Sequence, residues 1–101
     1  MKIMERHISR VRAGQWATVE SVEKQYDAIE QPWSFPPKRR YRALYGGQSR
    51  EFYVTEREWE GMANREAALG SAFGSPEWLA LAQELDQAIE SLQIEIFQVL
   101  D

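Results

Sequence analysis

The chain has 101 residues, a formal net charge of −4, no cysteine and a single histidine. This composition excludes disulfides, thiolate chemistry and a metal site built from several histidines of one chain. The acidic balance argues against general nucleic-acid or anionic-membrane binding. No apolar run approaches the roughly 20 residues of a membrane span, and the charged N-terminus lacks an apolar signal-peptide core. We therefore expect one domain over residues 1–101 in a cytoplasmic protein with no cofactor.

The first third of the chain predicts a strand followed by a helix. Residues 3–11 alternate loosely and are rich in Ile and Val, as in a strand. The next apolar residues recur at steps of three and four, which places them on one stripe of a helix: Trp16, Val19, Val22, Tyr26 and Ile29. The helix is expected to stop by Gln31, because Pro32 follows.

A β-hairpin is predicted around the glycine-containing segment "GGQS", which "RRYRALY" precedes and "REFYV" follows. Pairing across this turn gives the hairpin one apolar face and one mixed face. The apolar face carries Tyr41, Ala43, Tyr45, Phe52 and Val54, and the mixed face carries Arg40, Arg42, Leu44, Glu51, Tyr53 and Thr55.

The remaining residues predict a broken helix and a final strand. In "TERE", Thr55 and Glu58 fit a capping box that starts the helix. Near Gly74 the helix is expected to break and restart, with Ser75 as the cap and Pro76 at the first position, so that Phe73 and Trp78 both reach the core. The second segment is expected to run to residue 92, before a strand over 94–100.

The resulting order, β-α-β-β-α-β, predicts an α+β, ferredoxin-like fold with a four-stranded antiparallel sheet and helices on one face. The last strand carries Ile94 and Ile96 on one side and Phe97 and Val99 on the other. Helices can cover only one of these sides. A second copy of the chain is the simplest cover for the other, so we expect a homodimer.

Three stretches resemble the dimeric α/β-barrel superfamily, and most closely its NIPSNAP-like members: "ERHISRVRAGQW", "EREWEGMANREAAL" and "SPEWLAL" with the downstream "IEIFQVL". The pattern covers nearly the whole chain in order, and "PEW" at a helix start is its most specific part. The resemblance implies two protomers whose sheets close face to face into a barrel, with the mixed hairpin face toward that barrel. Fold resemblance by itself does not transfer chemistry.

The superfamily also includes cofactor-independent monooxygenases and haem-degrading enzymes. This chain departs from the haem-degrading pattern, because its only histidine lies in the first strand. The resemblance is compatible with two functions. The first is a homodimer that binds a small organic molecule, which can be anionic, with no assigned reaction. The second is a cofactor-independent monooxygenase or isomerase that uses His7.

His7 is the natural acid–base candidate, because histidine titrates near neutral pH. The alternative is a structural histidine whose hydrogen bond is satisfied by a neighbouring carboxylate such as Glu5. The sequence shows no further titratable group with an evident link to it.

The basic cluster "KRRYR" over residues 38–42 also allows two interpretations. Arg40 and Arg42 share a face and can hold a carboxylate or phosphate. Alternatively, their charges protect an edge strand. The ligand-site hypothesis joins His7, Arg40, Arg42 and Tyr53. Trp33 and Phe35 lie in the proline-rich loop after the first helix. They either cover the core or line a pocket mouth or the partner surface.

Overall fold

The computed structural model describes residues 1–46 and 50–101 of the chain. Its elements follow the order β1 (Ile3–Val11), α1 (Trp16–Ile29), a short 3₁₀ helix η1 (Gln31–Trp33), β2 (Arg39–Arg42), β3 (Phe52–Trp59), α2 (Met62–Phe73), α3 (Pro76–Ala88) and β4 (Ile89–Gln98). The four strands form one antiparallel sheet in the order β2-β3-β1-β4. The predicted α+β, ferredoxin-like fold is confirmed.

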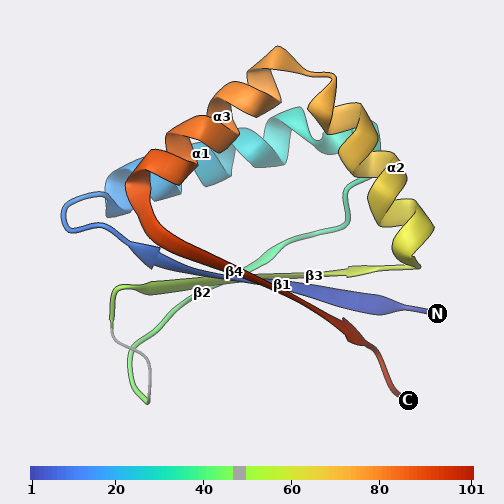
Figure 1. Ribbon diagram of the computed structural model, residues 1–101, viewed down its shortest axis with the longest axis horizontal. Coiled ribbons are helices and arrows are strands. Elements are labelled where there is room, and N and C mark those ends of the chain that lie inside the picture. The colour runs from blue at the N-terminus through green and yellow to red at the C-terminus, as the bar shows by residue number, and fades with distance from the viewer. Residues whose placement is uncertain (47–49) are drawn as a thin grey trace.

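All three α-helices lie on one face of the sheet, as Figure 1 shows. Helix α1 packs through the predicted stripe, in which Val19, Val22 and Tyr26 are buried. Against this stripe lie Leu81 and Leu85 of α3. The antiparallel contact between α1 and α3 forms the roof of the molecule, and the sheet forms its floor.

The break between the second and third helices is confirmed. Helix α2 ends at Phe73, and α3 begins at Pro76 after the cap residue Ser75. The Ser75 hydroxyl accepts a hydrogen bond from the Trp78 backbone N–H at 3.2 Å. Proline at the first helical position loses no intrahelical hydrogen bond, so these residues define a clean restart.

The predicted capping box at Thr55 and Glu58 is wrong. Both residues belong to β3, which continues to Trp59, and α2 begins only at Met62. The eight residues of β3 alternate between the two sides of the sheet, and they pair along β1 from Arg10↔Phe52 to Ile3↔Trp59. Cross-strand pairing with a central strand outweighs the local capping signal. Trp59 therefore reaches the core from a strand, at 2% exposure.

The start of the last strand was also predicted too late. Helix α3 passes into β4 at Ile89 with no intervening loop, so Leu92 lies in the strand and is half exposed. Phe73 does not reach the core, because its side chain is 59% exposed and packs edge-on against Trp78. The small residue Ala72 takes the buried position at the end of α2.

The hairpin has the predicted faces, with Arg40 opposite Thr55 and Arg42 opposite Tyr53. Residues 47–49 of the predicted turn lie outside the described residues. The expected direction of the mixed face is wrong. Tyr53 packs in the core with Val19 and Trp16 of α1, so the mixed face points toward the helices. Many of the sheet residues whose side chains point toward the helices are therefore polar.

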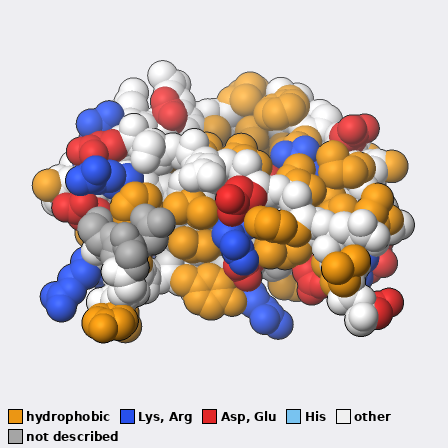
Figure 2. Space-filling view, turned by 60° about the horizontal axis from the view of Figure 1, so that its bottom comes forward, with side chains coloured by type: hydrophobic (Ala, Val, Ile, Leu, Met, Phe, Trp, Pro, Cys, Tyr) orange, Lys and Arg blue, Asp and Glu red, His pale blue; other side chains and the backbone are white. Residues whose placement is uncertain are grey.

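Within residues 1–46 and 50–101, no helix covers the opposite side of the sheet (Figure 1). We call this side the bare face. Figure 2 shows it partly, with hydrophobic side chains separated by acidic and basic ones. By strand alternation, its apolar members are Met4, Ile8, Tyr41, Phe52, Val54 and Phe97. Arg6 crosses it, with ion pairs to Glu56 at 2.8 Å and Glu95 at 3.8 Å.

Candidate functional site

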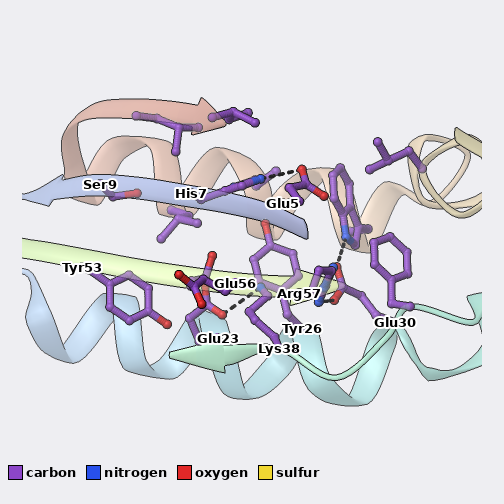
Figure 3. Close-up of a pocket in the computed structure, with 18 of the residues that line it drawn as sticks. Glu5, His7, Ser9, Glu23, Tyr26, Glu30, Lys38, Tyr53, Glu56 and Arg57 are labelled. Atoms are coloured by element: carbon purple, nitrogen blue, oxygen red, sulfur yellow. Dashed lines mark hydrogen bonds and ion pairs between the residues drawn. The ribbon is translucent and has the colours of Figure 1, made fainter. Parts of the chain in front are cut away.

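A cavity of about 310 Å³ lies between the helices and the inward face of the sheet. Strands β1, β3 and β4 supply its floor, and α1, α2 and α3 supply its walls. It exists because several inward positions of the sheet carry short or polar side chains, which do not fill the space under the helices. Figure 3 shows the cavity with polar side chains from β1, β3 and α1 directed into it.

Glu5 is the centre of a hydrogen-bond cluster at one end of the cavity. Its carboxylate accepts hydrogen bonds from His7 Nε2 at 2.7 Å, Arg65 at 3.0 Å and the Trp59 indole N–H at 2.9 Å. The donors come from three elements, because Arg65 lies on α2 and Trp59 ends β3. Glu5 itself is buried. The cluster ties the first strand to the second helix.

These contacts determine the protonation of Glu5. Burial alone would raise its pKa, but the hydrogen bonds from His7, Arg65 and Trp59 outweigh burial and hold the pKa far below the ordinary value of 4.5. Glu5 is therefore an anion that can only accept hydrogen bonds. Its contact with His7 requires a proton on Nε2. In the neutral ring, Nδ1 then carries the free lone pair, as in other carboxylate–histidine pairs.

Three buried residues present hydroxyl groups to the cavity: Ser9, Tyr26 and Thr55. None has a hydrogen-bond partner in the part of the chain that the structure describes. Figure 3 shows the ring of Tyr26 rising from α1, with its hydroxyl directed toward the strand that carries His7. Burial raises the pKa of Tyr26, and the nearby carboxylates of Glu23 and Glu30 raise it further, so this phenol remains a hydrogen-bond donor.

Apolar side chains form most of the remaining wall. They are Phe35, Leu69, Phe73, Trp78, Ala82, Leu85, Ile89, Leu92 and Ile94. Phe35 combines the two roles that the sequence left open, because it packs against Trp59 with ring centroids 5.4 Å apart and also lines the cavity. Trp33 is half-buried at the end of η1. A chamber with apolar walls and few polar groups is typical of small-molecule sites.

Each basic side chain of the cavity wall is already paired with a carboxylate. Arg57 contacts Glu30 at 3.1 Å, and Lys38 contacts Glu23 at 3.0 Å. Trp78 donates a further hydrogen bond to Glu30 at 2.8 Å. Arg65 is held by Glu5, as described above. Because their charges are offset, these cations give the cavity little excess attraction for an anion.

Arg40 and Arg42 lie outside this cavity, beside a second groove of about 390 Å³ between α1 and β2. Arg40 is bound by Glu23 at 3.0 Å and by Asp27 at 2.7 Å. Arg42 stacks on the Trp16 ring at 4.0 Å and has no carboxylate partner within residues 1–46 and 50–101. Tyr53 lines both spaces. The structure thus separates His7 from the two arginines that the sequence grouped with it.

Strand β2 is an edge of the sheet, as the charge-protection interpretation of the basic cluster expects. Arg40 is half-buried, whereas Arg39 and Arg42 are exposed, although Arg42 stacks on the Trp16 ring. The edge position fits charge protection, and the ligand-site interpretation stays a prediction.

Sequence reasoning missed Tyr26 as a cavity residue, since its place on the apolar stripe of α1 suggested core alone. It also missed the buried carboxylates Glu23 and Glu30. A signal for these was present: with Val19 and Val22, they occupy steps of three and four on the same helix face. A charged residue on an apolar stripe requires a partner inside the protein. The link from Glu5 to His7 was anticipated, but only as a structural contact.

Among the described residues, no group of three or more potential metal ligands comes together, and no helix combines the length and apolar character needed to cross a membrane.

The fold of this chain is similar to those of several solved structures. A NIPSNAP family protein from Agrobacterium tumefaciens superposes with a TM-score of 0.82 at 20% identity, over 99% of this chain and 87% of the other. A NIPSNAP-like domain protein from Burkholderia xenovorans gives a TM-score of 0.79 at 14% identity, over 98% and 85%. The chain has the NIPSNAP fold.

The same fold extends to an enzyme. SnoaB from Streptomyces nogalater, described as a cofactor-independent oxygenase, superposes in its N63A variant with a TM-score of 0.76 at 17% identity, over 99% of this chain and 94% of the other. The sequence matches no protein-family model and no curated protein. At these identities the similarity describes the NIPSNAP-like fold and leaves the chemistry to the site.

Proposed function

We propose that the protein binds a small, largely apolar organic molecule in the cavity above the sheet, with one polar edge of the ligand directed at His7 and Tyr26. One observation carries this proposal: Tyr26 is only 5% exposed, lines the cavity and has no hydrogen-bond partner among the described residues. The Tyr26 hydroxyl oxygen is not one of the fully buried atoms without a partner, so it is open to the cavity and free to bond to water or to a ligand group. Ser9 and Thr55 place further hydroxyl groups of this kind along the floor.

The charge of the walls favours a neutral ligand over an anionic one in this cavity. The cations Lys38, Arg57 and Arg65 are already paired. The expected anionic site at Arg40 and Arg42 remains a proposal for the second groove, where Arg42 has the freer guanidinium group. Ligand binding at Arg42 would replace solvent around a charge that no carboxylate offsets.

Two probes of similar shape test these assignments by calorimetry. We expect 2-naphthol to bind in the cavity and the Tyr26→Phe substitution to weaken its binding about 5- to 10-fold, because one hydrogen bond is lost. Tyr41→Phe, on the bare face, is the matched control and should leave the affinity unchanged. We expect 2-naphthoate to bind more weakly and to lose affinity in the Arg42→Ala variant. If neither probe binds, or if Tyr26→Phe and Tyr41→Phe behave alike, the proposed cavity site is wrong.

Proton transfer by His7 is a second candidate function. The specific observation that favours it is the 2.7 Å contact with Glu5, which fixes the ring and directs the basic lone pair to Nδ1. The cofactor-independent oxygenase with the same fold makes such chemistry compatible with this architecture. Under this candidate, the protein is an enzyme that needs no cofactor, either a monooxygenase or an isomerase. A cytoplasmic location stays a prediction of the sequence.

We further propose that a second copy of the chain covers the bare face. The face exposes Tyr41 and Phe97 by 46% and 42%, beside half-buried Met4 and Ile8. Polar and ionic groups separate these side chains, as in surfaces that associate by complementary charge as well as by apolar contact. Two sheets packed through this face would remove the exposed apolar area from water.

Light scattering is expected to give a mass twice that of the 11.8 kDa chain. The Ile8→Asp substitution places a charge in the centre of the bare face, so this variant should be monomeric. Leu79→Asp is the matched control, because Leu79 is an aliphatic residue of the same size on α3, on the helical side, and this variant should remain dimeric. A monomer mass for the unaltered chain at micromolar concentration would contradict the dimer.

A further inference from the structure

We propose that His7 and Tyr26 form an acid–base pair that exchanges a proton at the carbon beside a ketone, so that the ligand class is a mainly apolar ketone with an acidic α-hydrogen. This inference rests on the proposed function and specifies its chemistry. It depends on groups from two layers of the fold, because His7 belongs to the sheet and Tyr26 to the helical roof.

Within the described residues, His7 Nδ1 and the Tyr26 hydroxyl each lack a hydrogen-bond partner. In its neutral form, His7 donates through Nε2 to Glu5, and its Nδ1 has no partner among the residues described, so Nδ1 can accept a proton. Tyr26 has a hydroxyl hydrogen but no acceptor within the same residues. A bound molecule must therefore present a weakly acidic hydrogen to one side of the cavity and an oxygen acceptor to the other.

A ketone satisfies both requirements with adjacent atoms. Its carbonyl oxygen can accept the Tyr26 hydrogen bond, while a hydrogen on the neighbouring carbon faces His7. The apolar walls, including Leu85, Leu92 and Trp78, provide the surroundings for a hydrocarbon or aromatic body. The raised pKa of Tyr26 keeps the phenol protonated, so it can donate at neutral pH.

The proton transfer is balanced without an oxidant or a cofactor. His7 Nδ1 takes the α-proton, and the electron pair of the C–H bond forms a C=C bond while the carbonyl π electrons move to oxygen. Tyr26 stabilises the resulting enolate by its hydrogen bond. The imidazolium, which Glu5 stabilises, then returns a proton to the same carbon or to the far end of a conjugated system. The first outcome is α-hydrogen exchange, and the second is isomerisation.

Glu5 acts through His7 and is a positioning residue. Its ionised carboxylate holds the ring in one tautomer and offsets the charge that appears on the imidazolium. The indole of Trp59 and the guanidinium of Arg65 hold the carboxylate in turn. The ring of His7 is therefore supported by residues from three different elements.

The experiment measures deuterium exchange into 2-tetralone by NMR in deuterated buffer, together with the affinity of the protein for the same ketone. We expect the unaltered protein to accelerate exchange over buffer alone. His7→Gln should lower the protein-dependent rate about 100-fold or more, the usual contribution of a general base. Tyr26→Phe should lower it about 100-fold through loss of the oxyanion donor. His7→Gln should retain most of its affinity for 2-tetralone, whereas Tyr26→Phe should bind it about 5- to 10-fold more weakly, because one hydrogen bond is lost.

Tyr41→Phe is the matched control and should exchange at the unaltered rate, because Tyr41 lies on the bare face. Binding without accelerated exchange, or equal rates in Tyr26→Phe and the unaltered protein, would overturn the acid–base pair and leave the binding site standing. Failure to bind 2-tetralone or 2-naphthol at all would instead overturn the proposed function. If His7→Gln does not fold, as judged by near-ultraviolet circular dichroism, the Tyr26→Phe rate decides the question alone.

Discussion

Replacing Glu5 with Gln is expected to destabilise the protein by about 3–5 kcal/mol, the cost typical of breaking a buried ion pair from one side. The substitution keeps the side-chain shape but removes the charge that His7, Arg65 and Trp59 share. Arg65 would then remain largely buried without a counter-charge, since its side chain is only 18% exposed. Desolvation of that charge dominates the expected loss.

Urea unfolding at neutral pH and a fixed chain concentration measures the effect, because a dimer makes apparent stability depend on concentration. Glu95→Gln is the matched control. Glu95 lies across the bare face from Arg6 at 3.8 Å, and its loss should cost less than about 1 kcal/mol. If both variants lose the same free energy of unfolding, the Glu5 cluster contributes no more to stability than a surface ion pair.

The stabilising contribution of Glu5 is expected to disappear in acid. The folded state lowers the pKa of Glu5 from its ordinary value of 4.5, so the unfolded chain binds the proton first as the pH falls. The contribution is fully present above pH 4.5 and is lost progressively below it. In this range each pH unit should remove about 1.4 kcal/mol.

The measurement compares the unaltered protein with Glu5→Gln at neutral pH and at about pH 3. Because Gln does not titrate, the difference in unfolding free energy between the two proteins isolates Glu5 from the other carboxylates. This difference should narrow by about 2 kcal/mol between pH 4.5 and about pH 3. A difference that stays constant over that range would mean that the hydrogen bonds to Glu5 do not lower its pKa.

The Glu5 cluster also explains how one small sheet supports a cavity. Buried polar groups are costly unless they are paired, and here the buried carboxylates Glu5, Glu23 and Glu30 each bind donors from another element. These pairs fix the distance between the sheet and the helices without filling the space between them. The same contacts that stabilise the layers therefore position His7 beside an open chamber.

The sequence by itself determined the order of the elements and the faces of the hairpin. The stripe of α1 repeats every three to four residues, and Ser75 with Pro76 gives a local start signal for α3. These features depend on residues close together in the chain, which is why a pattern predicts them. The apolar character of the last strand on both sides is likewise local, and it supports the proposed dimer.

The tertiary structure decided the features that depend on distant partners. Thr55 and Glu58 fit a helix-capping box, but pairing with β1 keeps them in a strand. The faces of the hairpin followed from alternation, whereas contact with α1 decided which face looks toward the helices. The candidate site depends most strongly on such distant contacts, because Arg65 and Glu5 are 60 residues apart in the sequence. Side chains from separate elements become one site only when packing brings the sheet and the helices together. A local sequence pattern therefore cannot predict which of these side chains will be in contact.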